Sequence, residues 1–404
     1  MPGCWGITGN TFPATSDEPV ATHSPILPMD PRANYLAHRE EIDGAIRAVL
    51  EGGRYILGPE VAAFEAEFAA YVGVRHAVGV GSGTEALHLA LLALGIGAGD
   101  VVATASHTAV ATVAAIELAG ATPLLVDIEP RTFTMDPERL EEAIAAQRAT
   151  PPSASVRAVI PVHLYGHPAD LTAILAVARR HDLRVIEDCA QAHGASWNGR
   201  RVGAHGDIAA FSFYPTKNLA ALGDGGAVVT DDPALAERVR LLREYGWRER
   251  YVSHFAGTNS RLDELQAAVL RVKLRHLEAE NARRRAIAAM YDQALAGSSV
   301  ALPRARTEGR HVYHQYVVRS PRRDALIEEF GGRGTRLLIH YPQPVHLQPA
   351  YRTRARLAPG GLPHTEQVCR EIVSLPMHPH LTDSQARTVT EWILSWDRAA
   401  VKGA

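Results

Sequence analysis

The chain has 404 residues, of which 46% are hydrophobic, and its 42 lysine and arginine side chains nearly balance 44 aspartates and glutamates. A formal charge of −2 excludes a broadly basic nucleic-acid surface and predicts no general attraction to anionic membranes. A chain of this length exceeds the usual size of one hydrophobic core, so we expect a large domain and a smaller one.

The first 28 residues lack the basic and apolar regions of a targeting segment, and no later stretch is apolar for long enough to span a membrane. We expect residues 1–28 to form a flexible extension. The three cysteines, Cys4, Cys189 and Cys369, are too scattered for a disulfide framework or a zinc cluster. These features together predict a cytoplasmic protein.

Apolar residues recur at helical spacing from residue 34 to 71, and after that short apolar runs alternate with helical stretches. This alternation predicts an α/β fold, with a mostly parallel sheet covered by helices on both faces. The expected strands are 76–80, 101–105, 123–127, 159–163, 184–187, 208–213 and 227–230.

A long helix is expected at 262–277, where Ser260 and Asp263 have the spacing of a capping box. Irregular composition at 296–310 indicates a boundary between domains. A last helix is expected after Thr382 and Gln385, which have the same capping spacing. We therefore divide the chain into a large domain at 29–295 and a small α+β domain at 296–404.

The run GVGSGTEA at 79–86 follows an expected strand and opens an expected helix. Backbone amides and the positive end of the helix dipole can bind a phosphate at such a turn. The run also satisfies the relaxed dinucleotide fingerprint G-x-G-x-x-A, but no acidic residue ends the following strand, which weakens a nicotinamide interpretation. A tight turn that uses glycine for backbone freedom explains the run equally well.

Asp188 and Lys217 stand near the ends of two further expected strands. Asp188 is either a helix cap or the partner of a buried cation. Lys217 follows a strongly apolar strand, so it should leave the edge of a buried sheet, which is an unusual setting for lysine. Because the strand ends of a parallel sheet converge on one crevice, the phosphate-binding turn, the carboxylate and the lysine should meet there.

This combination matches the needs of pyridoxal 5′-phosphate. The turn fixes the phosphate, the lysine amine forms an imine with the cofactor's aldehyde, and the carboxylate keeps the ring nitrogen protonated. We therefore predict this cofactor, with Lys217 and Asp188 as the catalytic residues.

Eight stretches, in order along the chain, carry a resemblance to a known family; among them are GSGTEALHLAL, VIEDCAQAHGA, FSFYPTKNLAALGDGGAVVT and SLPMHPHLT. From about residue 27 to residue 396 the chain resembles the DegT/DnrJ/StrS family of sugar aminotransferases. The resemblance implies fold type I of the pyridoxal-phosphate-dependent transferases. That fold has a large domain, with a mostly parallel seven-stranded sheet between helices, and a smaller C-terminal α+β domain.

The resemblance also implies roles for single residues. Lys217 would hold the cofactor covalently, Asp188 would pair with its ring nitrogen, and Gln191 would bond its phenolic oxygen. His107 would stack on the cofactor ring. Asn259 would reach the phosphate from a second subunit, which implies a homodimer with shared active sites.

Three residues are implied in phosphate binding: Gly83 and Thr84 through backbone amides, and Ser212 through its hydroxyl. Plainer interpretations remain for several of these positions. Ser212 could satisfy backbone groups in a strand, Asn259 could cap a helix, and His107 could begin one. Ala109 departs from the family, which frequently has an aromatic residue there.

The implied substrates are L-glutamate as amino donor and a nucleotide-linked ketosugar as acceptor. Arg248, Arg250 and Tyr341 are candidate substrate-binding residues, because arginine suits the acceptor's pyrophosphate. A 3-keto-6-deoxyhexose is favoured, in natural-product or polysaccharide biosynthesis. Amination of a 4-ketosugar or of scyllo-inosose, which would form an aminocyclitol, stays open.

Two other function classes compete with the aminotransferase. A nicotinamide oxidoreductase would leave Lys217 unexplained, and a non-catalytic sensor or scaffold of the same fold would tolerate its loss. A metal site is not expected, because Gly166 and Pro168 prevent His163 and His167 from sharing one helical face.

Overall fold

The computed structural model of the protein describes residues 25–149 and 155–402, so residues 1–24 of the expected extension lie outside the described residues. The last part of that extension does not fit the expectation of a flexible tail. Ile26 is buried among apolar side chains of the long helix α9 (Glu264–Ala294) and of the C-terminal segment. Within the described ranges, no helix is both long enough and apolar enough to cross a membrane.

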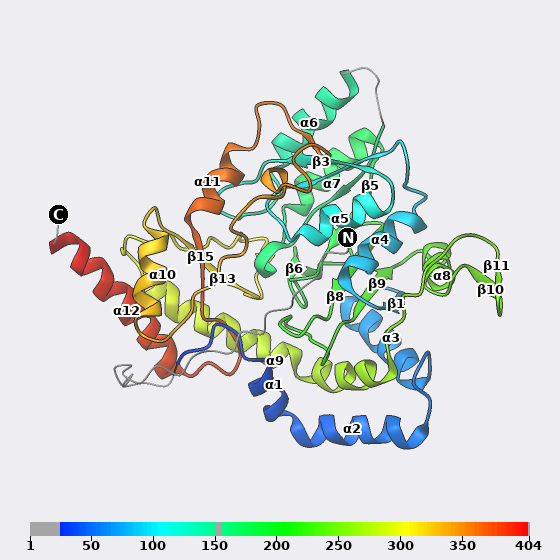
Figure 1. Cartoon of the computed structure of the whole chain (residues 1–404), viewed down its shortest axis with the longest axis horizontal. Coiled ribbons are helices and arrows are strands. Elements are labelled where there is room, and N and C mark those ends of the chain that lie inside the picture. Colours follow the sequence, from blue (N-terminus) through cyan, green and yellow to red (C-terminus); the bar gives the residue numbers. More distant parts are fainter. Residues whose placement is uncertain (1–24, 150–154, 403–404) are drawn as a thin grey trace, which may run out of the picture.

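The core of the fold is an eight-stranded sheet in the order β1-β9-β8-β5-β4-β2-β3-β14 (Figure 1). The neighbours from β8 to β14 pair in parallel, whereas β9 is antiparallel to both β8 and β1. The strands are β1 His76–Val80, β2 Val101–Ala105, β3 Thr122–Val126, β4 Val156–Ile160, β5 Arg184–Asp188, β8 Ile208–Ser212, β9 Gly226–Thr230 and β14 Arg356–Leu357.

The seven strands up to β9 were predicted, but β4 lies three residues earlier than expected. Pro161 explains this shift, because proline has no N–H to donate to a sheet ladder and the strand ends at Ile160. The eighth strand, β14, was not predicted. It has two residues and joins the edge of the sheet beside β3.

Helices cover both faces of the sheet. Along β8, Ile208 and Ala210 pack with α4 (Gly83–Ala93) and α8 (Pro233–Leu242), while Ala209 and Phe211 pack with α3 (Pro59–Val72) and α9. This alternation follows from the two-residue period of a strand and buries the sheet on both sides. The other helices of this part are α1 (Pro31–Ala37), α2 (Arg39–Gly52), α5 (Val110–Leu118), α6 (Pro137–Ala149) and α7 (Leu171–His181).

Helix α9 has 31 residues, almost twice the predicted length. The predicted helix ended at residue 277, shortly before two buried polar residues, Asn281 and Arg284, interrupt the apolar pattern. The capping box expected at Ser260 and Asp263 is wrong, because the Ser260 hydroxyl donates to Glu85 at 2.9 Å and Asp263 makes no side-chain cap bond.

The capping box at Thr382 and Gln385 is confirmed. The Gln385 amide donates to the Thr382 hydroxyl at 3.1 Å, and the Thr382 amide donates to the Gln385 side chain at 3.0 Å. Helix α12 (Asp383–Lys402) begins there.

The C-terminal segment builds a second, smaller core and also returns to the sheet. β13 (Tyr316–Arg319) pairs with β15 (Ile372–Leu375), and α10 (Arg323–Gly331) and α12 lie beside them (Figure 1). They lie far from the hairpin of β10 (Trp247–Glu249) and β11 (Val252–Ser253). In the segment that connects β13 to β15, the amides of His364 and Thr365 at the start of α11 (Pro363–Glu371) donate to Asp127, which follows β3. After residue 295 the chain therefore returns to the sheet of the expected large domain, through β14 and through the start of α11.

Candidate active site

The carboxyl ends of β2, β5 and β8 and the amino end of α4 surround one cavity of about 200 Å³. Strands that are buried on both faces expose their polar residues only where they end, so this edge of the sheet concentrates the chemistry. Six of the eight residues expected around the cofactor line the cavity: Gly83, Thr84, Asp188, Gln191, Ser212 and Lys217.

The amino end of α4 provides an anion-binding corner of this cavity. The helix begins at Gly83, and its N-cap Ser82 accepts the Glu85 amide at 3.2 Å. The amides of Gly83 and Thr84 lie in the first turn, where a helix offers N–H groups that have no partner in the helix. A Cβ on Gly83 would lie 2.5 Å from the Cβ of Ser212, so glycine is what lets the helix end approach that hydroxyl-bearing side chain.

Lys217 provides an uncommitted amine at the cavity wall. Its backbone amide donates to Tyr214 in the loop after β8, which turns the side chain toward the cavity. Among the described residues, the amine has no hydrogen-bond or ion-pair partner. Burial lowers the pKa of Lys217 to about 8, against the opposing effect of the Asp188 charge. A useful fraction of the amine is therefore neutral close to neutral pH.

Asp188, the last residue of β5, is 4% exposed. Its Oδ1 accepts the Ala190 amide at 3.1 Å, and its Oδ2 accepts the Thr112 hydroxyl at 2.8 Å. Burial raises the pKa of the Asp188 carboxyl, whereas these two hydrogen bonds hold it down. A carboxylate has about four lone-pair sites, so Asp188 can still accept a bond from a ligand N–H.

Gln191 and Tyr341 lie together on another side of the site. The Gln191 amide nitrogen donates to the Tyr341 hydroxyl at 3.1 Å, and its oxygen accepts the Tyr165 amide at 2.7 Å. Burial raises the pKa of Tyr341 to about 12, so its phenol stays protonated. Because the Tyr341 oxygen accepts from Gln191, its own O–H remains free to donate. The structure therefore brings the predicted Tyr341 to the predicted Gln191.

His107 is not where the sequence analysis expected it. It is 1% exposed and lies outside the set of cavity-lining residues, which instead includes its neighbours Thr108 and Ala109. Its Nε2 bonds the Tyr165 hydroxyl at 2.8 Å, and its Nδ1 lies 3.4 Å from the Cys369 thiol. Burial lowers the pKa of His107 to about 3, so the ring is neutral. This histidine supports the cavity wall rather than facing the cavity.

Asn259 is also absent from the cavity lining of its own chain and is exposed. It pairs through its backbone with Glu244, next to a short hairpin formed by β10 (Trp247–Glu249) and β11 (Val252–Ser253). Arg248 and Arg250 are exposed on that hairpin, and the Arg250 guanidinium lies 4.9 Å from the centre of the Tyr251 ring. Within one chain, these three predicted residues do not meet Lys217.

Three residues of the site, Thr112, Tyr214 and Asp224, were not predicted from the sequence. Tyr214 and Asp224 line the cavity, and Thr112 binds Asp188. The signal for Thr112 was present as two threonines four residues apart, Thr108 and Thr112, at the start of a helix after a buried strand. Its contact with Asp188 could not be inferred, because β4 lies between β2 and β5 in the sheet.

The histidine pair noted in the sequence is occupied by local bonds. His163 bonds Glu187 through Nε2 at 3.1 Å and accepts the Ala169 amide through Nδ1 at 3.0 Å. His167 accepts the Arg306 amide. Glu187 accepts three further backbone amides, so its hydrogen bonds hold the loop at 203–206 against the sheet.

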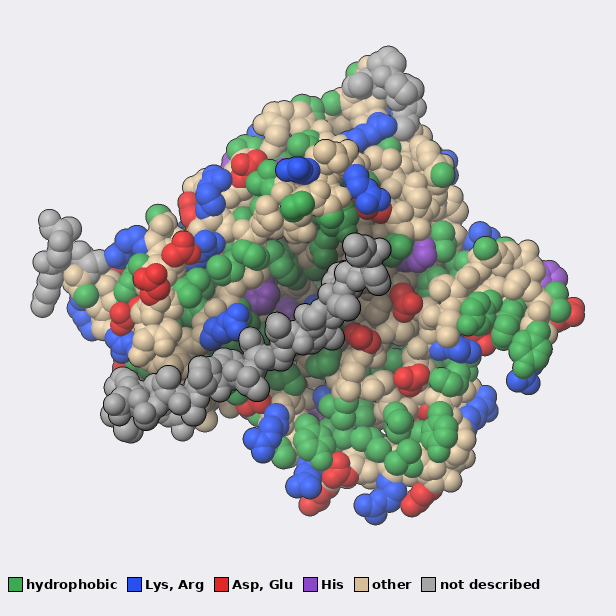
Figure 2. Space-filling view, in the orientation of Figure 1, with side chains coloured by type: hydrophobic (Ala, Val, Ile, Leu, Met, Phe, Trp, Pro, Cys, Tyr) green, Lys and Arg blue, Asp and Glu red, His purple; other side chains and the backbone are tan. Residues whose placement is uncertain are grey.

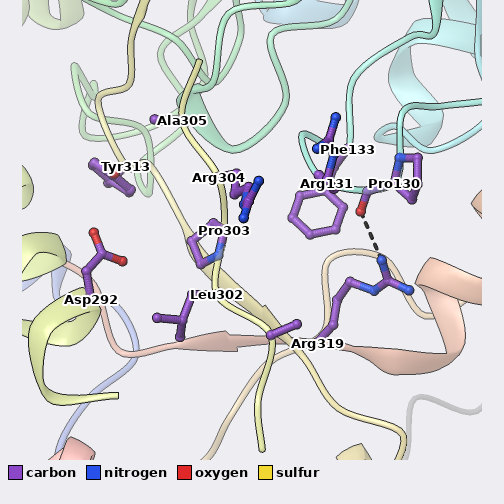
Figure 3. Close-up of a pocket in the computed structure, with 11 residues that line it drawn as sticks. Pro130, Arg131, Phe133, Asp292, Leu302, Pro303, Arg304, Ala305, Tyr313 and Arg319 are labelled. Carbon is purple, nitrogen blue, oxygen red and sulfur yellow. Dashed lines mark hydrogen bonds between the residues drawn. The ribbon is translucent and has the colours of Figure 1, made fainter. Parts of the chain in front are cut away.

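A larger cavity of about 970 Å³ opens between the loop after β3 and the segment after α9 (Figure 3). Its arginines are already engaged in part: Arg319 donates to the Pro130 carbonyl at 3.0 Å, the dashed line in Figure 3, and to Glu371, while Arg131 pairs with Glu129. Its described lining includes the carboxylate of Asp292 but no lysine amine. We therefore place the chemistry in the smaller cavity.

Comparison with known proteins identifies the family of the chain. The model of the DegT/DnrJ/EryC1/StrS aminotransferase family matches residues 37–394. A Streptomyces venezuelae protein named dTDP-3-amino-3,4,6-trideoxy-alpha-D-glucose transaminase is 51% identical over 369 residues, which cover 91% of this chain and 95% of that protein.

Two further similarities extend over most of the chain. The Saccharopolyspora erythraea protein named erythromycin biosynthesis sensory transduction protein EryC1 is 53% identical, over 89% of this chain and 96% of its own length. The crystal structure of S. venezuelae DesV in complex with a ketimine intermediate is 51% identical and superposes with a TM-score of 0.87, covering 92% of this chain and 98% of that one.

The lowered pKa of Lys217 generates a labelling prediction. In cofactor-free protein, modification of Lys217 by an amine-selective reagent should rise with pH through a midpoint near 8, because only the neutral amine reacts and burial depresses the pKa. Mass spectrometry of the labelled peptide measures the midpoint. Asp188→Asn should move it lower, since the lost negative charge no longer favours the ammonium form. A midpoint near the usual 10.5 would contradict the burial of the amine.

Proposed function

Because the chain belongs to the DegT/DnrJ/EryC1/StrS aminotransferase family, we propose that it transfers an amino group from L-glutamate to a nucleotide-linked 3-ketosugar with the help of pyridoxal 5′-phosphate. The observation that carries this proposal is the cavity that holds an uncommitted lysine amine, a buried carboxylate and the amino end of a helix. A nicotinamide oxidoreductase would leave that combination of groups unexplained.

The residues of the cavity fit the cofactor. The amides of Gly83 and Thr84 and the Ser212 hydroxyl would bind its phosphate, because they form the anion-binding corner. Asp188 would accept a hydrogen bond from the ring nitrogen, and Gln191 can donate its second N–H to the phenolic oxygen. When bound, the cofactor supplies an electron sink for the electrons left on carbon after proton removal.

Lys217 would anchor the cofactor and would then serve as the base. Its Nζ would take the proton from the donor's α-carbon and hold it for return within the same cavity. The lowered pKa of Lys217 suits this task, because a base works best when its pKa is close to the operating pH. An ionised Asp188 would favour a protonated ring nitrogen and so help to stabilise the negative charge that proton removal leaves.

The proposed acceptor carries its ketone at carbon 3 of a 6-deoxyhexose. The main support comes from likeness: the S. venezuelae transaminase is named for a 3-amino sugar and matches nearly the whole chain. Tyr341 adds support from chemistry, since its free O–H lies beside Gln191 at the site and can donate to a sugar or phosphate oxygen.

We propose that the active unit is a homodimer in which the hairpin region serves the partner's site. Figure 2 shows hydrophobic side chains gathered over α2 and over the β10–β11 hairpin, where Leu50, Tyr55, Ile56, Tyr251 and Val252 are between 42% and 72% exposed. Such apolar exposure indicates a protein contact surface. Asn259, Arg248 and Arg250 would then reach a second chain's phosphate and pyrophosphate groups.

A sensor function is the second candidate, and the name of the S. erythraea relative is what favours it. A sensor would need the cofactor pocket without proton transfer. Lys217 argues against it, because phosphate and ring contacts alone could hold a ligand without a buried amine of lowered pKa.

The substrate proposal predicts a sharp preference for one ketone position. Enzyme loaded with cofactor should lose its visible absorption band on addition of L-glutamate, and a 3-keto-6-deoxy nucleotide sugar should restore the band. The 4-keto isomer and scyllo-inosose should react about 100-fold more slowly, because they displace the reacting carbon by more than 1 Å. Stopped-flow absorption measures each rate. A band that no amino donor alters would favour the sensor, and faster reaction of the 4-keto isomer would overturn the carbon-3 assignment.

The shared-site proposal predicts complementation between two inactive variants. Lys217→Arg and Asn259→Ala should each lose most activity alone. In a mixed dimer, one of the two sites combines the intact Lys217 of one chain with the intact Asn259 of the other. Random mixing makes half of the dimers mixed, so activity should return to about a quarter of the wild-type value. If Asn259 acts within its own chain, mixing restores nothing. Arg139→Ala, at an exposed position on α6 where the arginine pairs with Glu142, is the control.

A further inference from the structure

The Asp188 carboxylate accepts a hydrogen bond from a hydroxyl group whose role the family resemblance does not explain. Thr112 lies in the first turn of α5 and is fully buried. Its Oγ1 lies 2.8 Å from Asp188 Oδ2 and 2.9 Å from the hydroxyl of Thr108. Thr108 in turn lines the cavity. The three side chains form one chain of hydrogen bonds from the cavity wall to the carboxylate.

The direction of these hydrogen bonds follows from counting hydrogens. An ionised carboxylate can only accept, so Thr112 must donate its single hydroxyl hydrogen to Asp188. Thr112 then has no hydrogen left for its neighbour, and Thr108 must be the donor in the bond between the two threonines. Each bond polarises the next, so the relay strengthens the donor that reaches Asp188.

Among the described residues, Thr112 provides the side-chain hydrogen bond that the Asp188 carboxylate accepts. The other hydrogen-bond donor to this carboxylate among the described residues is the backbone amide of Ala190. The titratable groups around it are Lys217, His163, Cys189 and Tyr341, and in the described part of the chain none of their side chains forms an ion pair or hydrogen bond with the carboxylate. Burial disfavours the charge of Asp188, and the hydrogen bond from the Thr112 hydroxyl opposes this effect more strongly than the charge of Lys217 does.

We propose that Thr112 is a positioning residue that keeps Asp188 ionised and oriented, and thereby keeps the cofactor's ring nitrogen protonated. The proposal rests on the proposed function, because it concerns the same cofactor. The amino end of α5 adds to the effect, since Thr112 in its first turn places the positive end of the helix dipole on the side of the carboxylate. Thr108 supports Thr112 from the cavity wall.

Two substitutions separate the hydroxyl from the shape of the side chain. Thr112→Val keeps the branched shape and removes the hydroxyl, which leaves the buried carboxylate with the Ala190 amide as its remaining donor among the described residues. Thr112→Ser keeps the hydroxyl and removes a methyl group. If the residue only fills space, Val is the milder change; if it sustains the charge of Asp188, Ser is the milder change.

The test uses enzyme loaded with pyridoxal 5′-phosphate labelled with nitrogen-15 in the ring, and reads the protonation of that nitrogen by NMR. Wild type and Thr112→Ser should give the resonance of a protonated ring nitrogen. Thr112→Val should shift it toward the position found in Asp188→Asn, with cofactor affinity reduced about tenfold or more, as expected for a lost hydrogen bond to a charged group. Thr112→Ala should behave as Thr112→Val and replaces it if the valine variant does not fold.

A protonated ring nitrogen in both Thr112→Val and Thr112→Ala would overturn the role of Thr112 and leave the proposed function intact. Loss of ring-nitrogen protonation in Thr112→Ser to the same extent as in Thr112→Val would also overturn that role, because a hydroxyl at position 112 would then not be sufficient. Failure of the wild type to bind the labelled cofactor would instead refute the proposed function, so the two outcomes are distinguishable.

Discussion

The structure depends on one electrostatic constraint: an amine and a carboxylate line the same cavity without forming an ion pair in the described residues. Lys217 and Asp188 are both disfavoured as charges by burial, and each opposes the effect on the other. Charges that are buried in this way are costly unless they are paired or hydrogen-bonded. Hydrogen bonds from Thr112 and Ala190 stabilise the carboxylate, whereas the amine is left uncommitted.

The fold meets this constraint by assembling the cavity from distant parts of the chain. The strand ends at Asp188 and Ser212 belong to the sheet, and the helix that begins at Gly83 packs against it. Burial of the sheet on both faces fixes the positions of these three ends. The C-terminal segment supports the cavity from behind its lining, because Tyr341 bonds the lining residue Gln191 and Cys369 contacts His107. The backbone carbonyl of His340 also accepts the Tyr165 hydroxyl. A change in the packing of the C-terminal segment would therefore reach the site directly.

Much of this arrangement follows from the sequence, because strand ends and glycine-rich turns obey local rules. The strands were placed by apolar runs, and Gly83, Asp188 and Lys217 by the convergence of parallel strand ends. The two-residue strand β14 could not be found, since its pairing with β3 is a long-range contact without periodicity. The length of α9 was missed because Asn281 and Arg284 are polar yet buried. His107 was misplaced because the order of residues after a strand does not reveal which of them turns inward.

The central claim, a covalent link between the cofactor and Lys217, is tested most directly by reduction and peptide mapping. The chain contains three lysines, Lys217, Lys273 and Lys402, so the assignment is unambiguous. Borohydride reduction of the loaded protein, followed by digestion and mass spectrometry, should find about one reduced cofactor per chain on the peptide that contains Lys217, as expected for one active-site lysine. A protein that takes up no cofactor, or a reduced cofactor attached to Lys273 instead, would contradict the account.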